Sequence, residues 1–187
     1  MTDLILIRHG ETDWNLEGRW QGQADVALNE RGRTQAVRIA QELKDVSISA
    51  IYSSDLIRAF ETAQELSEAT GLPIQIDRRL REIHQGEWQG MLVADIRSRY
   101  ADHFERRRLD PLNIAPPGGE TVAQVRSRVL AAVHEIVSQH PSETVAIVSH
   151  GFALAVILAE YQGHPIDDVW KLIPDNGAWQ RIEISSE

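Results

Sequence analysis

Short runs of consecutive apolar residues alternate along the chain with longer stretches in which apolar residues recur every three or four positions. The clearest runs are residues 4–7 and 145–148, and unbroken runs of this length are typical of strands buried on both faces of a parallel sheet. Further strands are predicted at residues 50–53, 74–76 and 178–184. Strands are therefore expected along the whole length of the chain.

Between the strands, the spacing of three and four residues predicts helices with one apolar face. The positions that define these faces are Ala36, Ala40 and Leu43; Leu56, Phe60, Ala63 and Leu66; and Val122, Val125, Val129, Ala132 and Ile136. Residues 152–161 are apolar on most sides, which indicates a buried helix. The segment 82–120 is less regular and contains a cluster of proline and glycine, so we expect loops and short helices there.

The alternation of strands and helices predicts an α/β fold, a three-layer α/β/α sandwich around a mainly parallel sheet. With 187 residues, of which 42% are apolar and 25% charged, the chain has the length and composition of a globular domain. No internal repeat, linker or low-complexity segment divides it, so residues 1–187 are interpreted as a single domain.

Charge and composition narrow the expected partners. A formal net charge of −9 disfavours nucleic acid and anionic membranes. No apolar run approaches the ~20 residues of a membrane span, and the first residues lack the basic region of a secretory signal, so a cytoplasmic location is expected. The absence of cysteine excludes disulfides, thiolate metal sites and cysteine nucleophiles. The sequence does not decide between a monomer and a homodimer.

Reactive side chains follow several of the predicted strands. The two clearest strands lead into similar tripeptides, Arg8-His9-Gly10 and Ser149-His150-Gly151. Arg58 comes soon after the second strand, and Glu82 soon after the third. Because ligands bind outside the carboxyl ends of the strands in open α/β sheets, we expect the two histidines, Arg58 and Glu82 to converge on one edge.

A group of this kind has the chemistry for phosphoryl transfer. A neutral imidazole is a nucleophile, flanking arginines hold phosphoryl oxygens, and a carboxylic acid can protonate the leaving oxygen. Such a site needs neither a metal nor a cofactor. A zinc site on His9 and His150 is disfavoured because Arg8 repels a cation, and the sequence has no H-E-x-x-H motif. Residue types and spacing alone predict a phosphate site and no more.

Several segments, taken in order, resemble the motifs of the histidine phosphatase superfamily (phosphoglycerate mutase-like). They are Leu6–Thr12 with Asn15, Gly22–Asp25, Ser53–Ala59 with Thr62, Leu80–Ile83 with Gly86–Gly90, Pro117–Glu120 and Val148–Gly151. The resemblance extends from about residue 3 to residue 177. It implies the phosphoglycerate mutase-like form of the three-layer fold.

The resemblance also implies roles for individual residues. His9 is implied to be the phosphorylated nucleophile, and Glu82 the general acid and base. The remaining implied contacts with the phosphoryl group or the substrate are Arg8, Arg58, His150, Asn15, Gln21 and Gly22. No metal and no cofactor are implied, and the expected partner is a small-molecule phosphate monoester.

The family contains both phosphatases and phosphoglycerate mutases. Mutases carry a longer insertion after the acid segment, because they need a lid that keeps water out. Here the region before Gly118 is short and offers little material for a lid. We therefore predict a metal-independent phosphatase with a phosphohistidine intermediate. The alternatives are a cofactor-dependent phosphoglycerate mutase and a non-catalytic phosphoester-binding protein, which would have no need of Glu82.

Three further expectations concern substrate choice, an arginine run and two tryptophans. The segment between Glu82 and Glu120 is expected to set substrate choice, with sugar, glycerate and cobalamin-precursor phosphates and a broad specificity all open. The run Arg106–Arg108 is interpreted as a solvated helix face rather than a contact with an acidic substrate. Trp170 and Trp179 are interpreted as core residues rather than interface residues.

Overall fold

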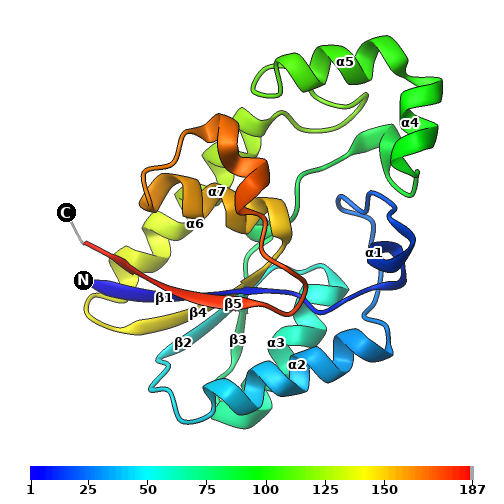
Figure 1. Cartoon of the computed structure of the whole chain (residues 1–187). Coiled ribbons are helices and arrows are strands. Elements are labelled where there is room, and N and C mark those ends of the chain that lie inside the picture. The colour runs from blue at the N-terminus through cyan, green and yellow to red at the C-terminus, as the bar shows by residue number, and fades with distance from the viewer. Residues whose placement is uncertain (186–187) are drawn as a thin grey trace.

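The computed structural model describes residues 1–185, and a mainly parallel sheet lies at its centre (Figure 1). The strands are β1 (Thr2–Arg8), β2 (Ala50–Ser53), β3 (Ile74–Ile76), β4 (Thr144–Ser149) and β5 (Trp179–Ile184). They are arranged in the order β3-β2-β4-β1-β5, and β5 alone runs antiparallel to its neighbour among the described strands. The predicted strands are confirmed to within one or two residues at their ends.

Helices cover both faces of this sheet. They are α1 (Asp13–Glu17), α2 (Glu30–Leu43), α3 (Ile57–Thr70), α4 (Val93–Arg99), α5 (Ala101–Leu109), α6 (Val122–Gln139) and α7 (Gly151–Tyr161). Short 3-10 helices are η1 (Arg78–Leu80), η2 (Gly86–Trp88) and η3 (Ile166–Leu172). None of the helices within the described residues is long and apolar enough to cross a membrane.

The unbroken apolar run in β1 has a simple cause. Leu4 and Leu6 face the core beneath α6 and α7, while Ile5 and Ile7 face the core beneath α2 and α3. Successive side chains of a strand point to opposite faces, so a strand covered by helices on both sides is apolar at every position. The same alternation in β4 sends Ile147 to the first core. The predicted three-layer sandwich is confirmed.

Several helical segments were not predicted from periodicity. Helix α1 has only five residues, too few to show a period, and begins at a capping box between Thr12 and Asn15. The helix η3 is likewise short. Helices α4 and α5 lie within the irregular segment 82–120 and stand away from the sheet, above α1 in the view of Figure 1. The short region before Gly118, which the sequence analysis considered too small for a lid, thus forms these two helices.

Candidate active site

The two strand-end histidines are neighbours in the structure. Strands β1 and β4 run parallel in a register that pairs Arg8 with Ser149, so the next residues, His9 and His150, lie side by side. Their ring centroids are 5.2 Å apart, with an angle of 59° between the ring planes. His9 is 2% exposed and His150 is fully buried. The sequence-based expectation that they meet at one edge of the sheet is confirmed.

The hydrogen bonds of His9 select one form of its ring. Nδ1 lies 2.6 Å from the carbonyl oxygen of Gly10, which can only accept, so Nδ1 carries the hydrogen. Nε2 then has a lone pair, and Nε of Arg58 donates to it over 3.3 Å. Burial, followed by the charges of Arg58 and Arg8, lowers the His9 pKa well below its ordinary value near 6.5. His9 is therefore a neutral imidazole at pH 7.

Arg58 is held beside His9 by backbone carbonyl groups. Its Nη1 and Nη2 donate to the carbonyl oxygens of Ala24 and Gly22, each over 2.7 Å. Burial lowers its pKa to about 10, so the guanidinium remains charged at neutral pH. It lies in the first turn of α3, where the carboxylate of Asp25 accepts from the backbone N–H of Ile57 over 2.7 Å. This contact caps the helix at an end that lacks a side-chain cap of its own.

Arg8 supplies a second guanidinium at the end of β1. Its Nη1 donates to the carbonyl oxygen of Pro174 over 2.5 Å, and its buried Nε has no hydrogen-bond partner among the described residues. Burial lowers the Arg8 pKa, and the negative charges of Glu82 and Asp175 partly oppose that shift. Arg8 therefore keeps a free donor beside His9, where an anion can accept from it.

His150 is bonded on one side only. Its Nε2 lies 2.8 Å from Oγ of Ser54, while its buried Nδ1 has no partner within residues 1–185. Burial, then the charges of Arg58, His9 and Arg8, lowers the His150 pKa well below its ordinary value. A buried polar atom without a partner costs free energy, and its cost is removed when a ligand group fills the place.

The carboxylate of Glu82 is held at the amino end of α7. It accepts from the backbone N–H groups of Ile83, Phe152 and Ala153 over 2.9, 3.1 and 3.3 Å. The positive end of the helix dipole favours a carboxylate at this place. The sequence places Glu82 only near the third strand, and the structure brings it to the ends of β1 and β4.

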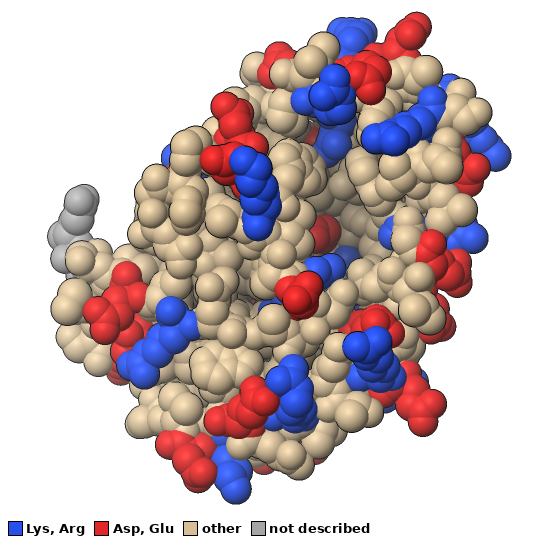
Figure 2. All heavy atoms as spheres, viewed as in Figure 1, with Lys and Arg blue, Asp and Glu red and all other residues tan. Residues whose placement is uncertain are grey.

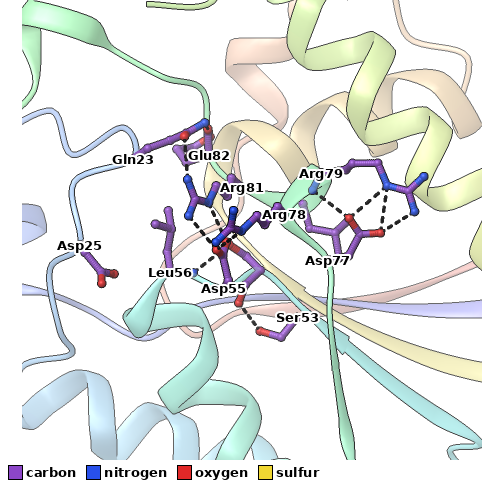
Figure 3. A network of polar contacts seen from close by, with 12 residues as sticks. Gln23, Asp25, Ser53, Asp55, Leu56, Asp77, Arg78, Arg79, Arg81 and Glu82 are labelled. Atoms are coloured by element: carbon purple, nitrogen blue, oxygen red, sulfur yellow. Dashed lines mark hydrogen bonds and ion pairs between the residues drawn. The ribbon is translucent and has the colours of Figure 1, made fainter.

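The backbone around Glu82 is fixed by a network of ion pairs (Figure 3). Arg81 bonds both oxygens of Asp55 over 2.6 and 2.7 Å. From the other side, Arg128 donates to the carbonyl oxygens of Arg81 and Glu82 and pairs with Glu120. These contacts hold the Glu82 main chain from both sides.

A pocket of about 320 Å³ opens above these groups, and Figure 2 shows this face of the molecule hollowed, with charged atoms of both signs inside. Its lining contains Arg8, His9, Asn15, Gln21, Gly22, Arg58 and Glu82 from the sequence-based set. His150 does not line the pocket, because its ring lies buried beside His9. Within the described residues, no group of three His, Asp or Glu side chains could hold a metal ion.

The two polar residues Asn15 and Gln21 are joined through Thr12. The Thr12 hydroxyl lies 3.0 Å from Oδ1 of Asn15 and 3.0 Å from Oε1 of Gln21. Asn176, from the loop before β5, donates to Oδ1 of Asn15 over 3.1 Å and to the carbonyl oxygen of His9 over 3.3 Å. Asn176 thus links Asn15, on one wall of the pocket, to the main chain of His9.

Part of the lining could not be found from the sequence. The additional lining residues are Arg19, Trp20, Ile83, Gln85, Gly151, Phe152, Trp170 and Ile173. They come from loops and helix ends far apart in the chain, and neither periodicity nor a strand end marks most of them. Three of them had a recoverable signal in the sequence, because Trp20 precedes Gln21, Ile83 follows Glu82 and Gly151 follows His150.

Two sequence-based interpretations are wrong. Arg106 and Arg108 are exposed, as a solvated face requires, but Arg107 is only 5% exposed, because aromatic rings surround its guanidinium. The tryptophans interpreted as core residues, Trp170 and Trp179, are 39% and 36% exposed. Trp170 packs on Phe152 at the pocket with a ring-centroid distance of 4.5 Å, and Trp179 lies at the start of the edge strand β5.

The chain is similar to known proteins over nearly its whole length. The model of the family described as histidine phosphatase superfamily (branch 1) matches residues 4–187. Phosphoserine phosphatase 1 of Hydrogenobacter thermophilus is 37% identical over 184 residues, which are 98% of this chain and 87% of that protein. Glucosyl-3-phosphoglycerate phosphatase of Mycobacterium tuberculosis is 38% identical over 189 residues, covering 96% and 84% of the two chains. The solved structure of Bacillus stearothermophilus YhfR has a TM-score of 0.90 at 40% identity, over 99% of this chain and 92% of that one.

Proposed function

The chain belongs to the histidine phosphatase superfamily (branch 1), and we propose that it hydrolyses small phosphate monoesters through a phosphohistidine on His9, without a metal ion. The observation that supports this most is the state of His9, a neutral imidazole whose Nε2 lone pair lies against Arg58. A neutral ring nitrogen beside fixed positive charge is suited to attack a phosphorus atom whose oxygens those charges hold.

In the first step, Nε2 of His9 attacks phosphorus and the bond from phosphorus to the ester oxygen breaks. Glu82, in its acid form, gives its proton to that oxygen, so the alcohol departs neutral. In the second step, a water oxygen attacks phosphorus, the P–N bond breaks, and the electron pair returns to Nε2. Glu82 takes the proton of the water. Phosphate leaves, and both residues regain their initial forms.

Positive charge and hydrogen-bond donors stabilise the transferring group. The three equatorial phosphoryl oxygens carry the charge in the transition state. Arg58 donates to Nε2, Arg8 lines the same pocket, and the Nε donor of Arg8 has no partner among the described residues. His150 lies beside His9 but outside the pocket lining, and its unpartnered Nδ1 donates to a phosphoryl oxygen bound at His9 when the Ser54 hydroxyl donates to Nε2. Asn15, Gln21 and Gly22 complete the substrate-binding wall.

The curated relatives named above are phosphatases, which supports hydrolysis over transfer to a second acceptor. The test is phosphate release from a panel of monoesters in EDTA by the wild type, His9→Ala and His164→Ala. His164 is an exposed histidine outside the site and serves as the matched control. We expect release by the wild type and His164→Ala, and none by His9→Ala.

Other outcomes separate the alternatives. Interconversion of the two phosphoglycerates without net phosphate release would establish a mutase. Phosphate binding without turnover in either the wild type or Glu82→Gln would establish a binding protein. Labelled phosphate that stays on the wild-type protein in base, is lost in acid and is missing from His9→Ala would identify the phosphohistidine. Release that EDTA abolishes would overturn the metal-free mechanism.

A further inference from the structure

His150 lies between two other residues that follow strands, and the order of the strands fixes which ones. In the sheet, β4 lies between β1 and β2, so the residue after β4 has the residues after β1 and β2 on its two sides. His9 lies on one side, with its ring centroid 5.2 Å from that of His150. Ser54 lies on the other side, where its Oγ is 2.8 Å from Nε2 of His150. Ser54 and His150 are both fully buried.

The main chain holds Ser54 in place and leaves its hydroxyl with one hydrogen to give. The N–H of Ser54 donates to the carbonyl oxygen of Val148 in β4 over 3.0 Å. The N–H of Leu56 donates to Oγ over 3.3 Å, and this contact uses a lone pair of the oxygen, not its hydrogen. Within residues 1–185, Nε2 of His150 is the one acceptor that the hydroxyl reaches. The hydroxyl therefore donates to Nε2.

A count of unpaired groups supports the same assignment. Burial, followed by the charge of Arg58, lowers the pKa of His150, so its neutral ring carries a single hydrogen. If this hydrogen lay on Nε2, two buried groups would lack partners among the described residues: the hydroxyl hydrogen of Ser54 and the lone pair of Nδ1. With the hydrogen on Nδ1, only that N–H lacks a partner. Unpaired buried polar atoms are unfavourable, so the second arrangement is preferred.

The two arrangements have opposite effects on a phosphoryl group bound at His9. Phosphoryl oxygens accept hydrogen bonds and carry negative charge in the transition state. An N–H at Nδ1 of His150 donates to such an oxygen, whereas a lone pair at Nδ1 repels it. The hydroxyl of Ser54 thus selects the form of His150 that is a donor.

We propose that Ser54 is a positioning residue, which keeps the ring hydrogen of His150 on Nδ1 so that this N–H donates to the phosphoryl group carried by His9. Ser54 is not among the residues that line the pocket, so it acts through His150 and not on the substrate. Both histidines then carry their hydrogen on Nδ1: an acceptor at Nδ1 fixes it in His9, and a donor at Nε2 fixes it in His150. The kinetic part of this inference rests on the proposed phosphatase activity, but the position of the hydrogen does not.

The position of the hydrogen is measured first, in the protein without substrate. Long-range proton–nitrogen NMR separates a ring nitrogen that carries hydrogen from one that does not, and the signals of His150 are those that disappear in His150→Ala. We expect the hydrogen on Nδ1 in the wild type and a substantial share of it on Nε2 in Ser54→Ala. The control is Ser53→Ala, which also removes a fully buried hydroxyl, but one that donates to a main-chain carbonyl oxygen. It should leave the hydrogen on Nδ1.

The kinetic consequence is measured with p-nitrophenyl phosphate. Deleting a donor to a developing oxyanion outright costs ~10²–10³-fold in kcat, and Ser54→Ala should cost about 10-fold to 100-fold, because part of the population keeps the productive form. KM should change less than kcat, since the donor acts on charge that develops in the transition state. Ser54→Thr keeps a hydroxyl and should restore both the Nδ1 hydrogen and most of kcat. Ser53→Ala should keep the wild-type kcat.

Failure of this inference can be told from failure of the proposed function. A hydrogen on Nε2 in the wild type, or an unchanged position in Ser54→Ala, would overturn it whatever the activity. A changed position with an unchanged kcat would overturn its catalytic half. If the wild type hydrolyses no ester, calorimetric binding of inorganic phosphate replaces kcat: Ser54→Ala should bind it more weakly than Ser53→Ala, and equal affinities would contradict the proposal. Should Ser54→Ala fail to fold, Ser54→Cys replaces it, since a thiol is a weaker donor and should move part of the hydrogen to Nε2.

Discussion

The Nδ1 atom of His9 and the carbonyl oxygen of Gly10 lie 2.6 Å apart, within one dipeptide. The contact sets which ring nitrogen of His9 carries hydrogen, and so which one can attack phosphorus. The peptide of Gly10 is itself fixed, because its N–H donates to Oγ1 of Thr62 on α3 over 3.1 Å. The proposed nucleophile is thus oriented by main-chain geometry, and that geometry can be tested.

Gly10→Ala should remove activity by displacing this main chain. A Cβ at position 10 would lie 2.3 Å from the carbonyl oxygen of Gly32, at the start of α2, and backbone cannot move aside cheaply. We expect a fall in Tm together with loss of phosphate release. The control is Gly18→Ala, whose Cβ meets nothing within 4 Å but whose positive φ costs some stability. Equal stability and activity in Gly10→Ala and wild type would contradict the packing argument.

The lowered pKa of His9 predicts the acid side of the pH profile. In the proposed mechanism the neutral ring is the active form. Because the folded pKa of His9 lies well below 6.5, protonation should not limit the enzyme between pH 8 and pH 6. Phosphate esters themselves titrate near about pH 6, so the ring should be followed directly. The NMR signals of the two imidazole rings are assigned as those that disappear in His9→Ala and in His150→Ala. In the wild type, these signals should not shift between pH 8 and pH 6. A shift centred at or above pH 6.5 would contradict the prediction.

The same shifts make folding stability depend on pH. His9 and His150 stay neutral in the folded protein but take up protons in the unfolded chain below about pH 6.5. The unfolded state then binds more protons, so the free energy of unfolding should fall as pH drops, by about 1.4 kcal/mol per histidine at pH 5.5. Urea unfolding at pH 7.5 and 5.5 measures this. His150→Asn should show a smaller difference between the two pH values than the wild type; an equal difference would contradict it.

The sequence predicts the strands and the residues at their ends, because both follow from the pattern of apolar residues along the chain. A strand buried on both faces must be apolar throughout, and its end must meet the ends of parallel neighbours, so the meeting of His9 and His150 follows from two short runs. Arg107 could not be predicted, because periodicity assigns a charged residue to the solvent face. Its burial depends on rings such as Trp20 and Trp170, whose approach is a property of the tertiary structure.

Arg128→Met should slow catalysis although Arg128 does not line the pocket. Its guanidinium donates to the carbonyl oxygens of Arg81 and Glu82, over 2.6 and 2.9 Å, and to both oxygens of Glu120 over 2.8 Å. Methionine leaves these acceptors unpaired, so we expect a loss of about 2–4 kcal/mol in stability. As the Glu82 main chain loosens, kcat should fall more than KM rises. Arg126 lies on the same helix as Arg128, is exposed and, among the described residues, pairs only with Glu160 of α7. Arg126→Met should therefore change neither stability nor kcat appreciably. A loss of stability with an unchanged kcat would show that Arg128 supports the fold but does not position Glu82.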